Sequence, residues 1–169
     1  VIKKSIKQGC KMERNAISLF SSSGIGDLGM HANGINTVVA CELIKERMDL
    51  FHNNNPGTQC FCGDILKLED EIVDFYRSKY EESPFLILAT PPCQGMSPNG
   101  MGKMLSDYRK GLRPQYDKRN RLIIPAVHII KKLQPQWIIF ENVANMGNTC
   151  IYDENEELVN IIDFIHREL

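Results

Sequence analysis

Short apolar runs alternate with stretches of helical character along this chain. The apolar runs predict five strands, which span residues 16–20, 37–41, 59–62, 85–89 and 137–140. The stretches between and after them predict helices, which span residues 27–32, 46–52, 69–80, 120–133 and 158–169. Strands separated by helices form right-handed βαβ units and a parallel sheet. The pattern therefore predicts an α/β fold with a doubly wound, Rossmann-like parallel sheet.

Two of the strands and one long loop have a distinctive composition. The runs at 85–89 (FLILA) and 137–140 (WIIF) are continuously apolar, which is typical of strands buried on both faces. Residues 94–117 are rich in Gly, Pro, Met and Ser and lack an apolar period. Because loops of that length in a compact domain are usually functional, we expect this one to be mobile and to close over a substrate.

The size and composition of the chain limit the classes of protein. Its 169 residues suffice for one domain, which we place at residues 1–169, and 43% apolar residues are ordinary for a globular protein. No apolar run is long enough to span a bilayer, and the N-terminus shows no signal-peptide pattern. The six cysteines lack zinc-binding spacing. We therefore expect no metal site, no membrane partner and a cytoplasmic location with reduced thiols.

The charges are unevenly distributed. The net charge of −1 excludes a chain that binds polyanions over its whole surface. Residues 101–121 nevertheless hold seven basic residues and only two acids, and we expect this run to contact phosphates. The acidic runs at 69–74 and 153–157 are interpreted as solvated surface.

Polar clusters follow the predicted strands at the point where each strand ends. They are Ser21–Gly26, Glu42, Gly63 with Asp64, Thr90–Gln94, and Glu141 with Asn142. In an open α/β sheet, ligands bind beyond the carboxyl ends of the strands. We therefore expect one site at that edge of the sheet, to which all five clusters contribute.

The first two clusters indicate a nucleotide-type cofactor. Residues 24–29 read Gly-Ile-Gly-Asp-Leu-Gly between a strand and a helix, and Glu42 ends the next strand, where it can accept hydrogen bonds from ribose hydroxyls. Binding of a nucleotide-type cofactor is favoured over a plain tight turn as the interpretation of these features, and they fit NAD as well as S-adenosylmethionine. Asp64 can accept from an adenine amino group flanked by Leu43 and Ile65, or equally cap the next helix.

Cys93 and Glu141 are the candidates for chemistry. Pro91 and Pro92 stiffen the chain before Cys93 and hold it at the mouth of the sheet. Because Cys93 leaves a core strand and enters a polar loop, a sulfur nucleophile is favoured over an inert buried thiol. Glu141 directly follows an apolar strand, and burial there would favour its protonated form, which suits hydrogen-bond donation or proton transfer. A surface glutamate at a strand end is the alternative.

Together these motifs resemble the N-terminal motifs of DNA cytosine-C5 methyltransferases over residues 16–143. The resemblance is carried, in this order, by Phe20 to Gly24, Glu42, Gly63-Asp64, Pro91-Pro92-Cys93-Gln94, Asp117 to Leu122 and Glu141-Asn142-Val143. The Pro-Pro-Cys-Gln and Glu-Asn-Val pair is highly specific, whereas the glycine loop alone is weak.

The resemblance implies the fold of S-adenosylmethionine-dependent methyltransferases and a role for each residue. Cys93 is implied as the nucleophile, and Glu141 as the group that holds the target base. The implied cofactor-binding residues are Phe20, Gly24, Gly26, Glu42, Leu43, Asp64, Ile65, Pro92 and Leu122. The implied reaction is methyl transfer to C5 of a cytosine flipped out of double-stranded DNA, through a covalent Cys93 adduct, with S-adenosylhomocysteine as the product. A restriction–modification methylase is the expected setting.

The sequence departs from the family pattern in two respects, and the second changes how much of the enzyme we expect this chain to contain. Ser22 stands where the family usually has glycine. We also find no Gln-x-Arg-x-Arg element, no target-recognition domain and no closing C-terminal motifs. We therefore expect the N-terminal part of the catalytic domain, with an incomplete fold, inactive alone and dependent on a missing C-terminal region or a second subunit.

Several alternatives remain open at this point. An RNA cytosine-C5 methyltransferase of the same family would share the Pro-Pro-Cys motif. An NAD-dependent oxidoreductase with a redox cysteine would explain the glycine loop but not Asp64, Cys93 and Glu141 together. An amino-methyltransferase is less favoured because that class places an aromatic residue at the position of Cys93. A non-catalytic partner is disfavoured by the presence of both Cys93 and Glu141.

Overall fold

The computed structural model describes residues 13–96, 110–111 and 117–169, and its centre is a five-stranded parallel sheet. The strands are β1 (Asn15–Leu19), β2 (Asn36–Glu42), β3 (Gln59–Cys62), β4 (Leu86–Ala89) and β5 (Trp137–Phe140). Their order is β3-β2-β1-β4-β5, and every neighbouring pair is parallel. The order reverses between β1 and β4, which is the switch point where ligands bind in doubly wound sheets.

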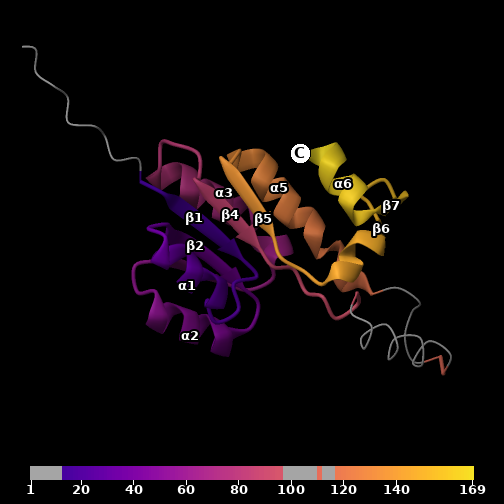
Figure 1. Ribbon diagram of the computed structural model, residues 1–169, viewed down its shortest axis with the longest axis horizontal. Helices are drawn as coiled ribbons and strands as arrows, with labels where there is room; N and C mark the ends of the chain where they lie inside the picture. The colour runs from indigo at the N-terminus through magenta and orange to yellow at the C-terminus, as the bar shows by residue number, and fades with distance from the viewer. Residues whose placement is uncertain (1–12, 97–109, 112–116) are drawn as a thin grey trace, which may run out of the picture.

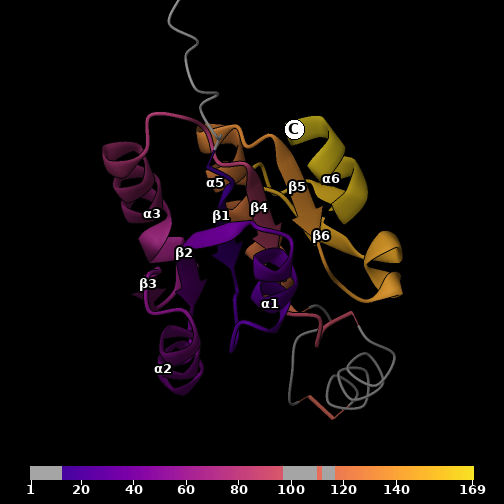
Figure 2. The same cartoon turned by 60° about the vertical axis from the view of Figure 1, so that its left-hand side comes forward.

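Helices cover both faces of this sheet (Figures 1 and 2). On one face, α1 (Ile25–Ala32) and α2 (Lys45–Asn54) pack against β1, β2 and β4 through Met30, Met48 and Phe51. On the other face lie α3 (Ile65–Lys79) and α5 (Ile123–Leu133), whose apolar sides form the main core with β1, β2 and β4. The predicted doubly wound α/β fold is therefore confirmed.

Shorter elements surround α5 and end the chain. They are the 3-10 helices η1 (Lys118–Leu122) and η2 (Ala144–Asn148), the hairpin strands β6 (Cys150–Tyr152) and β7 (Leu158–Asn160), and helix α6 (Ile161–Glu168). A second apolar cluster, which includes Met96, Met146 and Phe164, joins them to the first turns of α5. None of the described helices has the length and apolar character that a membrane span requires.

The boundaries of two predicted helices differ from the structure for local reasons. Helix α3 begins at Ile65, a turn before the predicted start at residue 69, because Asp64 caps it by accepting a hydrogen bond from the Leu66 amide at 3.1 Å. The predicted helix at 120–133 is divided into η1 and α5, and Asp117 caps η1 through the Arg119 amide at 3.0 Å.

The predicted helix at 158–169 is wrong in its first three residues. Residues 158–160 form β7, which pairs antiparallel with β6. The helix begins only after Asn160, whose side chain caps it by accepting from the Ile162 amide at 2.8 Å. The interpretation of 153–157 as solvated surface is wrong for Asp153 alone, which is buried and pairs with Arg167 at 2.8 Å, whereas residues 154–157 are exposed.

The two continuously apolar strands differ in burial. All four residues of β4 are buried, as predicted. The prediction that β5 is buried on both faces is wrong, because Trp137 is 63% exposed and Ile139 is 48% exposed. Register explains the difference: Trp137 and Ile139 lie beside Leu86 and Leu88, which α1 covers, whereas β5 is the last strand of the described sheet and α1 does not reach over it.

A buried carboxyl group under α1 gives a pH-dependent contribution to stability. Asp27 accepts hydrogen bonds from Ser18 Oγ at 3.0 Å and Thr37 Oγ1 at 2.7 Å. Burial raises the pKa of Asp27, although the bonds from Thr37 and Ser18 oppose the rise. Because the folded pKa lies above the unfolded one, the stabilisation is complete below the unfolded value of about 3.9 and is lost as pH rises through the folded value.

We therefore expect the free energy of unfolding to fall less in Asp27→Asn than in the unchanged protein as the pH rises from 4 to 7. The measurement is the free energy of unfolding in urea across that range. Asp74→Asn, on the exposed side of α3, is the matched control and should leave the pH dependence unchanged. Parallel curves for the Asp27 variant and the unchanged protein would contradict the assignment.

Candidate active site

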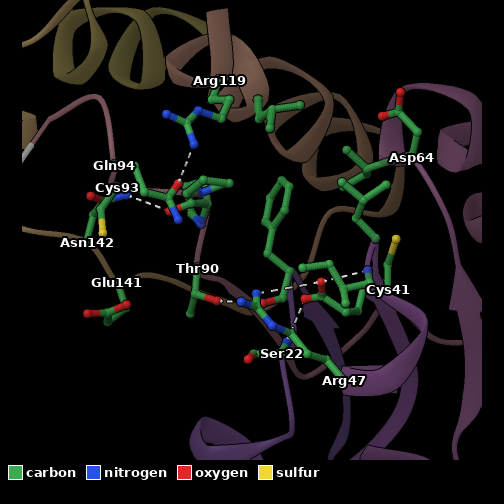
Figure 3. A pocket seen from close by; sticks show the side chains of 18 of the residues that line it. Ser22, Cys41, Arg47, Asp64, Thr90, Cys93, Gln94, Arg119, Glu141 and Asn142 are labelled. Carbon is green, nitrogen blue, oxygen red and sulfur yellow. Dashed lines mark hydrogen bonds and ion pairs between the residues drawn. The ribbon is translucent and has the colours of Figure 1, made fainter. Parts of the chain in front are cut away.

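A cavity of about 420 Å³ opens at the carboxyl ends of the strands, next to the switch point (Figure 3). That volume is in the range of small-molecule and cofactor sites. Side chains from the loops after β1, β2, β3, β4 and β5 all line it, as the positions of the polar clusters predict. Its lining includes Phe20, Glu42, Leu43, Asp64, Ile65, Pro92, Cys93, Leu122 and Glu141. Among the described residues, no group of three or more His, Cys, Asp or Glu side chains could hold a metal ion.

Glu42 is a buried carboxylate at the end of β2. Its Oε2 accepts a hydrogen bond from the Ser22 amide at 2.9 Å, and its Oε1 accepts one from the Ile44 amide at 2.9 Å. The Arg47 guanidinium lies 4.0 Å away. Each carboxylate oxygen has a second lone pair, so Glu42 can also accept from a pair of neighbouring hydroxyls in the cavity.

The turn after β1 contains two residues in the left-handed region, Phe20 at φ 59° and Ser22 at φ 50°. Three hydrogen bonds hold the turn in this shape. Besides the Ser22–Glu42 bond, Ser21 N donates to Cys41 O at 3.0 Å, and Thr90 Oγ1 donates to Phe20 O at 2.9 Å. The turn is thus fixed to β2 and to the end of β4, and it presents Phe20 and Ser22 to the cavity.

The left-handed conformation at Ser22 predicts how substitutions there change the stability of the protein. Glycine adopts that region without the steric penalty of a Cβ atom, which is about 1 kcal/mol. We expect Ser22→Gly to be more stable than Ser22→Ala by about 1 kcal/mol in urea unfolding, because both variants lack the hydroxyl and only alanine keeps the penalty. An alanine variant as stable as the glycine variant would show that the turn relaxes.

The two predicted cofactor-binding glycines lie outside the cavity lining. Gly24 precedes α1 at φ 88°, and a Cβ atom there would lie 2.9 Å from the Phe51 ring. At Gly26, a Cβ atom would lie 2.8 Å from the Leu88 side chain. In this structure both glycines allow α1 to pack closely against α2 and the sheet.

Asp64 and its neighbours form the far end of the cavity from Cys93 (Figure 3). Asp64 caps α3 with Oδ1, as one of the two sequence interpretations proposed. The cap uses one oxygen, so the second role, acceptance from an amino group in the cavity, is compatible with it. Ile65 is buried below, whereas Leu43 is 65% exposed at the rim.

Cys93 and Glu141 lie at the opposite end of the cavity, on the loops after the adjacent strands β4 and β5 (Figure 3). Cys93 is half-buried, and its carbonyl accepts a hydrogen bond from the Met96 amide at 2.9 Å, which closes a turn. The expectation that Glu141 is buried is wrong. Its side chain is exposed because β5 is the last strand of the described sheet and its loop faces solvent.

Arg119 is a cavity residue that sequence reasoning did not single out. Its guanidinium pairs with Asp117 and donates to Gln94 Oε1 at 3.3 Å, so it links η1 to the Cys93 turn. The hydrogen bond with Asp117 raises the pKa of Arg119 further above its ordinary value. The spacing Asp-x-Arg could have indicated the pair. Arg47 also lines the cavity without having been predicted to, whereas Asn142 lines it as a member of the fifth polar cluster.

Gly95 lies against η1 in an approach that leaves no room for a side chain. A Cβ atom there would lie 2.5 Å from Asn120 Oδ1 and 2.6 Å from Asp117 Cβ. This contact fixes the Cys93 turn to η1. The predicted mobile loop at 94–117 lies outside the described residues except at 94–96, 110–111 and 117, and so do the basic residues Lys103, Arg109 and Arg113 of the predicted phosphate-binding run.

Curated bacterial proteins are similar to most of this chain. The type II methyltransferase M1.HgaI of Avibacterium volantium is 34% identical over 149 residues, which are 86% of this chain and 39% of that protein. M.AquIA of Picosynechococcus is 30% identical over 137 residues, which are 81% of this chain and 51% of that protein. The chain thus spans about two fifths to one half of the length of these relatives.

Solved structures share the fold. A DNA modification methyltransferase encoded within a prophage of E. coli superposes with a TM-score of 0.66 at 23% identity, over 92% of this chain and 37% of that one. DNMT2 of Spodoptera frugiperda superposes with a TM-score of 0.58 at 19% identity, over 92% of this chain and 40% of that one. The family model of C-5 cytosine-specific DNA methylases matches residues 14–165, and this chain therefore belongs to that family.

Proposed function

We propose that this chain carries the cofactor site and the nucleophile of an enzyme that methylates C5 of cytosine in double-stranded DNA. One observation carries the proposal: a single cavity joins the carboxylates Glu42 and Asp64 at one end to Cys93 and Glu141 at the other. Because the family acts on DNA and the curated relatives are type II methyltransferases, we propose modification within a cytoplasmic restriction–modification system.

The chemistry of the residues that line the cavity supports S-adenosylmethionine as the cofactor. Glu42 is buried and fixed by two backbone amides, which suits an acceptor for the two ribose hydroxyls. Asp64 has an oxygen free of the helix cap for an adenine amino group. The walls between these acids are apolar, which suits an adenine ring, and they are Phe20, Leu43, Ile65 and Leu122. When bound, this cofactor supplies an electrophilic methyl group.

The glycine loop favours this cofactor over a dinucleotide. In NAD-binding sheets, the glycine-rich turn approaches the pyrophosphate directly. Here Gly24 and Gly26 do not line the cavity, and a Cβ atom at these positions would collide with Phe51 and Leu88, respectively. We propose that these two glycines support the cofactor site indirectly, by setting the position of α1 and of the turn after β1.

The chain's own residues act on the cytosine. The thiolate of Cys93 forms a bond to C6 of the ring, which makes C5 nucleophilic, while the Glu141 carboxyl donates a hydrogen bond to N3 and disperses the developing charge. After C5 has gained the methyl group, a base removes the C5 proton and the C6–sulfur bond breaks, which restores the thiolate. Because Cys93 cannot reach C6 inside a duplex, the base must be flipped out, and the exposed Glu141 is placed to meet it.

We propose that recognition of the DNA sequence depends on polypeptide that the longer relatives have outside the matched region. The net charge of −1 supports this division, because a DNA-binding surface is basic. RNA is the second candidate substrate. The description of the family and of its relatives favours DNA.

Calorimetry with the unchanged chain tests the cofactor assignment. We expect S-adenosylhomocysteine to bind and NAD to give no heat. The reaction is then tested with the chain together with the remaining part of the enzyme, S-adenosylmethionine and a duplex that contains 5-fluorocytosine. Fluorine at C5 takes the place of the proton that must leave, so Cys93 stays covalently attached. Binding of NAD alone would overturn the proposal, and an adduct on single-stranded RNA but not on duplex DNA would select the second substrate.

A further inference from the structure

Two asparagine side chains join the turn that carries Cys93 to the segment that carries Glu141. Asn142 Nδ2 donates to the Pro91 carbonyl at 2.9 Å, and Asn145 Nδ2 donates to the Met96 carbonyl at 2.9 Å. Pro91 and Met96 stand on either side of Cys93 in the sequence. The two bonds therefore hold the nucleophile's turn at both ends.

Both asparagines are held by the segment that follows β5. Asn142 Oδ1 accepts a hydrogen bond from the Val143 amide at 2.9 Å, which leaves Nδ2 of the same group directed at Pro91. The backbone carbonyl of Asn145 accepts from Thr149 Oγ1 at 2.9 Å. The segment after β5 thus orients the Asn142 amide and fixes the backbone of Asn145.

The two prolines of the turn limit the hydrogen bonds that the turn can donate. Pro91 and Pro92 have no amide hydrogen, so neither can donate to a neighbouring loop. The Met96 side chain is fully buried beside Met146, which anchors one end by packing. Phe140 and Val143 also pack against the same apolar cluster, so packing joins the two segments at Met96, and the two amides bridge them by direct hydrogen bonds.

We propose that Asn142 and Asn145 are positioning residues, which fix the Cys93 sulfur relative to the Glu141 carboxylate so that both can meet one base. The proposal rests on the function proposed above, in which these two groups act together. Neither amide needs to touch the base. Their effect is to keep the loops that follow the adjacent strands β4 and β5 from separating before the substrate binds.

The reactivity of Cys93 toward iodoacetamide reports its distance from Glu141 in the unchanged chain. A carboxylate beside a thiol slows alkylation of the sulfur, so Glu141→Gln should speed alkylation of Cys93 at pH 7.5. We expect about a threefold increase, the scale of one unit charge acting through water between neighbouring side chains. Peptide mass spectrometry separates Cys93 from the other thiols, and the exposed Cys150 serves as the internal reference.

The proposal is tested by repeating this comparison with each amide removed. In Asn142→Ala and in Asn145→Ala, we expect the ratio of alkylation rates with and without Glu141→Gln to approach one, because the loops are free to separate. The remaining charged groups that line the cavity are unchanged in every variant: Glu42, Arg47, Asp64 and Arg119.

Two further variants make the result decisive. Asn33→Ala removes an amide-to-carbonyl bond of the same kind, from Asn33 Nδ2 to Gly29 O at 2.9 Å, at the end of α1 and should keep the threefold ratio. Asn142→Asp and Asn145→Asp keep the size of the side chain and lose the donor, so they replace the alanine variants if those do not fold. The added charge cancels, since each ratio is taken within one background.

The possible results distinguish failure of the positioning role from failure of the proposed function. A threefold ratio that survives in both amide variants would overturn the positioning role and leave the proposed function intact. A ratio of one in the otherwise unchanged chain would show that Cys93 and Glu141 are not neighbours, which contradicts the proposed function itself. Loss of the ratio in the Asn33 variant would attribute the effect to general loosening and would also overturn the proposal.

Discussion

Replacement of Cys93 by alanine is expected to abolish both methyl transfer and the covalent adduct with 5-fluorocytosine DNA. Because the proposed reaction proceeds through a bond between the Cys93 sulfur and C6, no other group in the cavity should substitute, and the rate should fall by at least about 10⁴-fold. The assay measures tritiated-methyl transfer to duplex DNA by the chain together with the remaining part of the enzyme. Affinity for S-adenosylhomocysteine should be retained.

Cys62→Ala is the matched control for this experiment. Cys62 ends β3 of the same sheet and is exposed, but it does not line the cavity. We expect that variant to form the adduct at the normal rate. An adduct that persists in the Cys93 variant, or that disappears in the Cys62 variant, would assign the nucleophile to another residue.

The second large effect is expected at Glu42. Glu42→Ala should weaken binding of S-adenosylhomocysteine by about 10- to 100-fold, which corresponds to ~1.4–2.8 kcal/mol and to the loss of charge-assisted hydrogen bonds to the ribose. The change also removes the acceptor for the Ser22 and Ile44 amides, so the turn after β1 should lose order. Calorimetry measures the affinity.

Two variants separate these contributions. Glu42→Gln keeps one oxygen acceptor and should lose less affinity than alanine does. Glu46→Ala, on the exposed side of α2, removes a carboxylate outside the cavity and should bind normally. Unchanged affinity in both Glu42 variants would contradict the assignment of the ribose site.

The sequence pattern predicted the parallel sheet because each strand is a compact apolar run followed by a polar cluster. It failed where tertiary context decides. β5 has the same apolar character as β4, and only the place of β5 at the end of the described sheet explains why Trp137 is exposed. Likewise, Leu158–Asn160 pairs with β6 as a strand, although the apolar spacing continues into α6.

The candidate site was predictable to the extent that its residues stand at strand ends, since parallel strands bring their carboxyl ends together. Cys93, Glu42 and Asp64 share one cavity for that reason. The contribution of Arg119 and the hydrogen bond from Asn142 to Pro91 were not predictable in this way. They depend on side chains that reach across from another loop, and a single sequence contains no record of such contacts.

The close approach of Gly95 to η1 has a consequence for any survey of tolerated substitutions. No side chain fits between Gly95 and the pair Asp117 and Asn120, where even a methyl group would meet atoms at 2.5 and 2.6 Å. In a saturation library of the whole enzyme selected for methyl transfer, every replacement at Gly95 should be depleted as severely as replacements at Cys93. Gly95 would then be scored as a chemical participant, although what it contributes is the empty volume that lets its backbone lie against the side chains of Asp117 and Asn120.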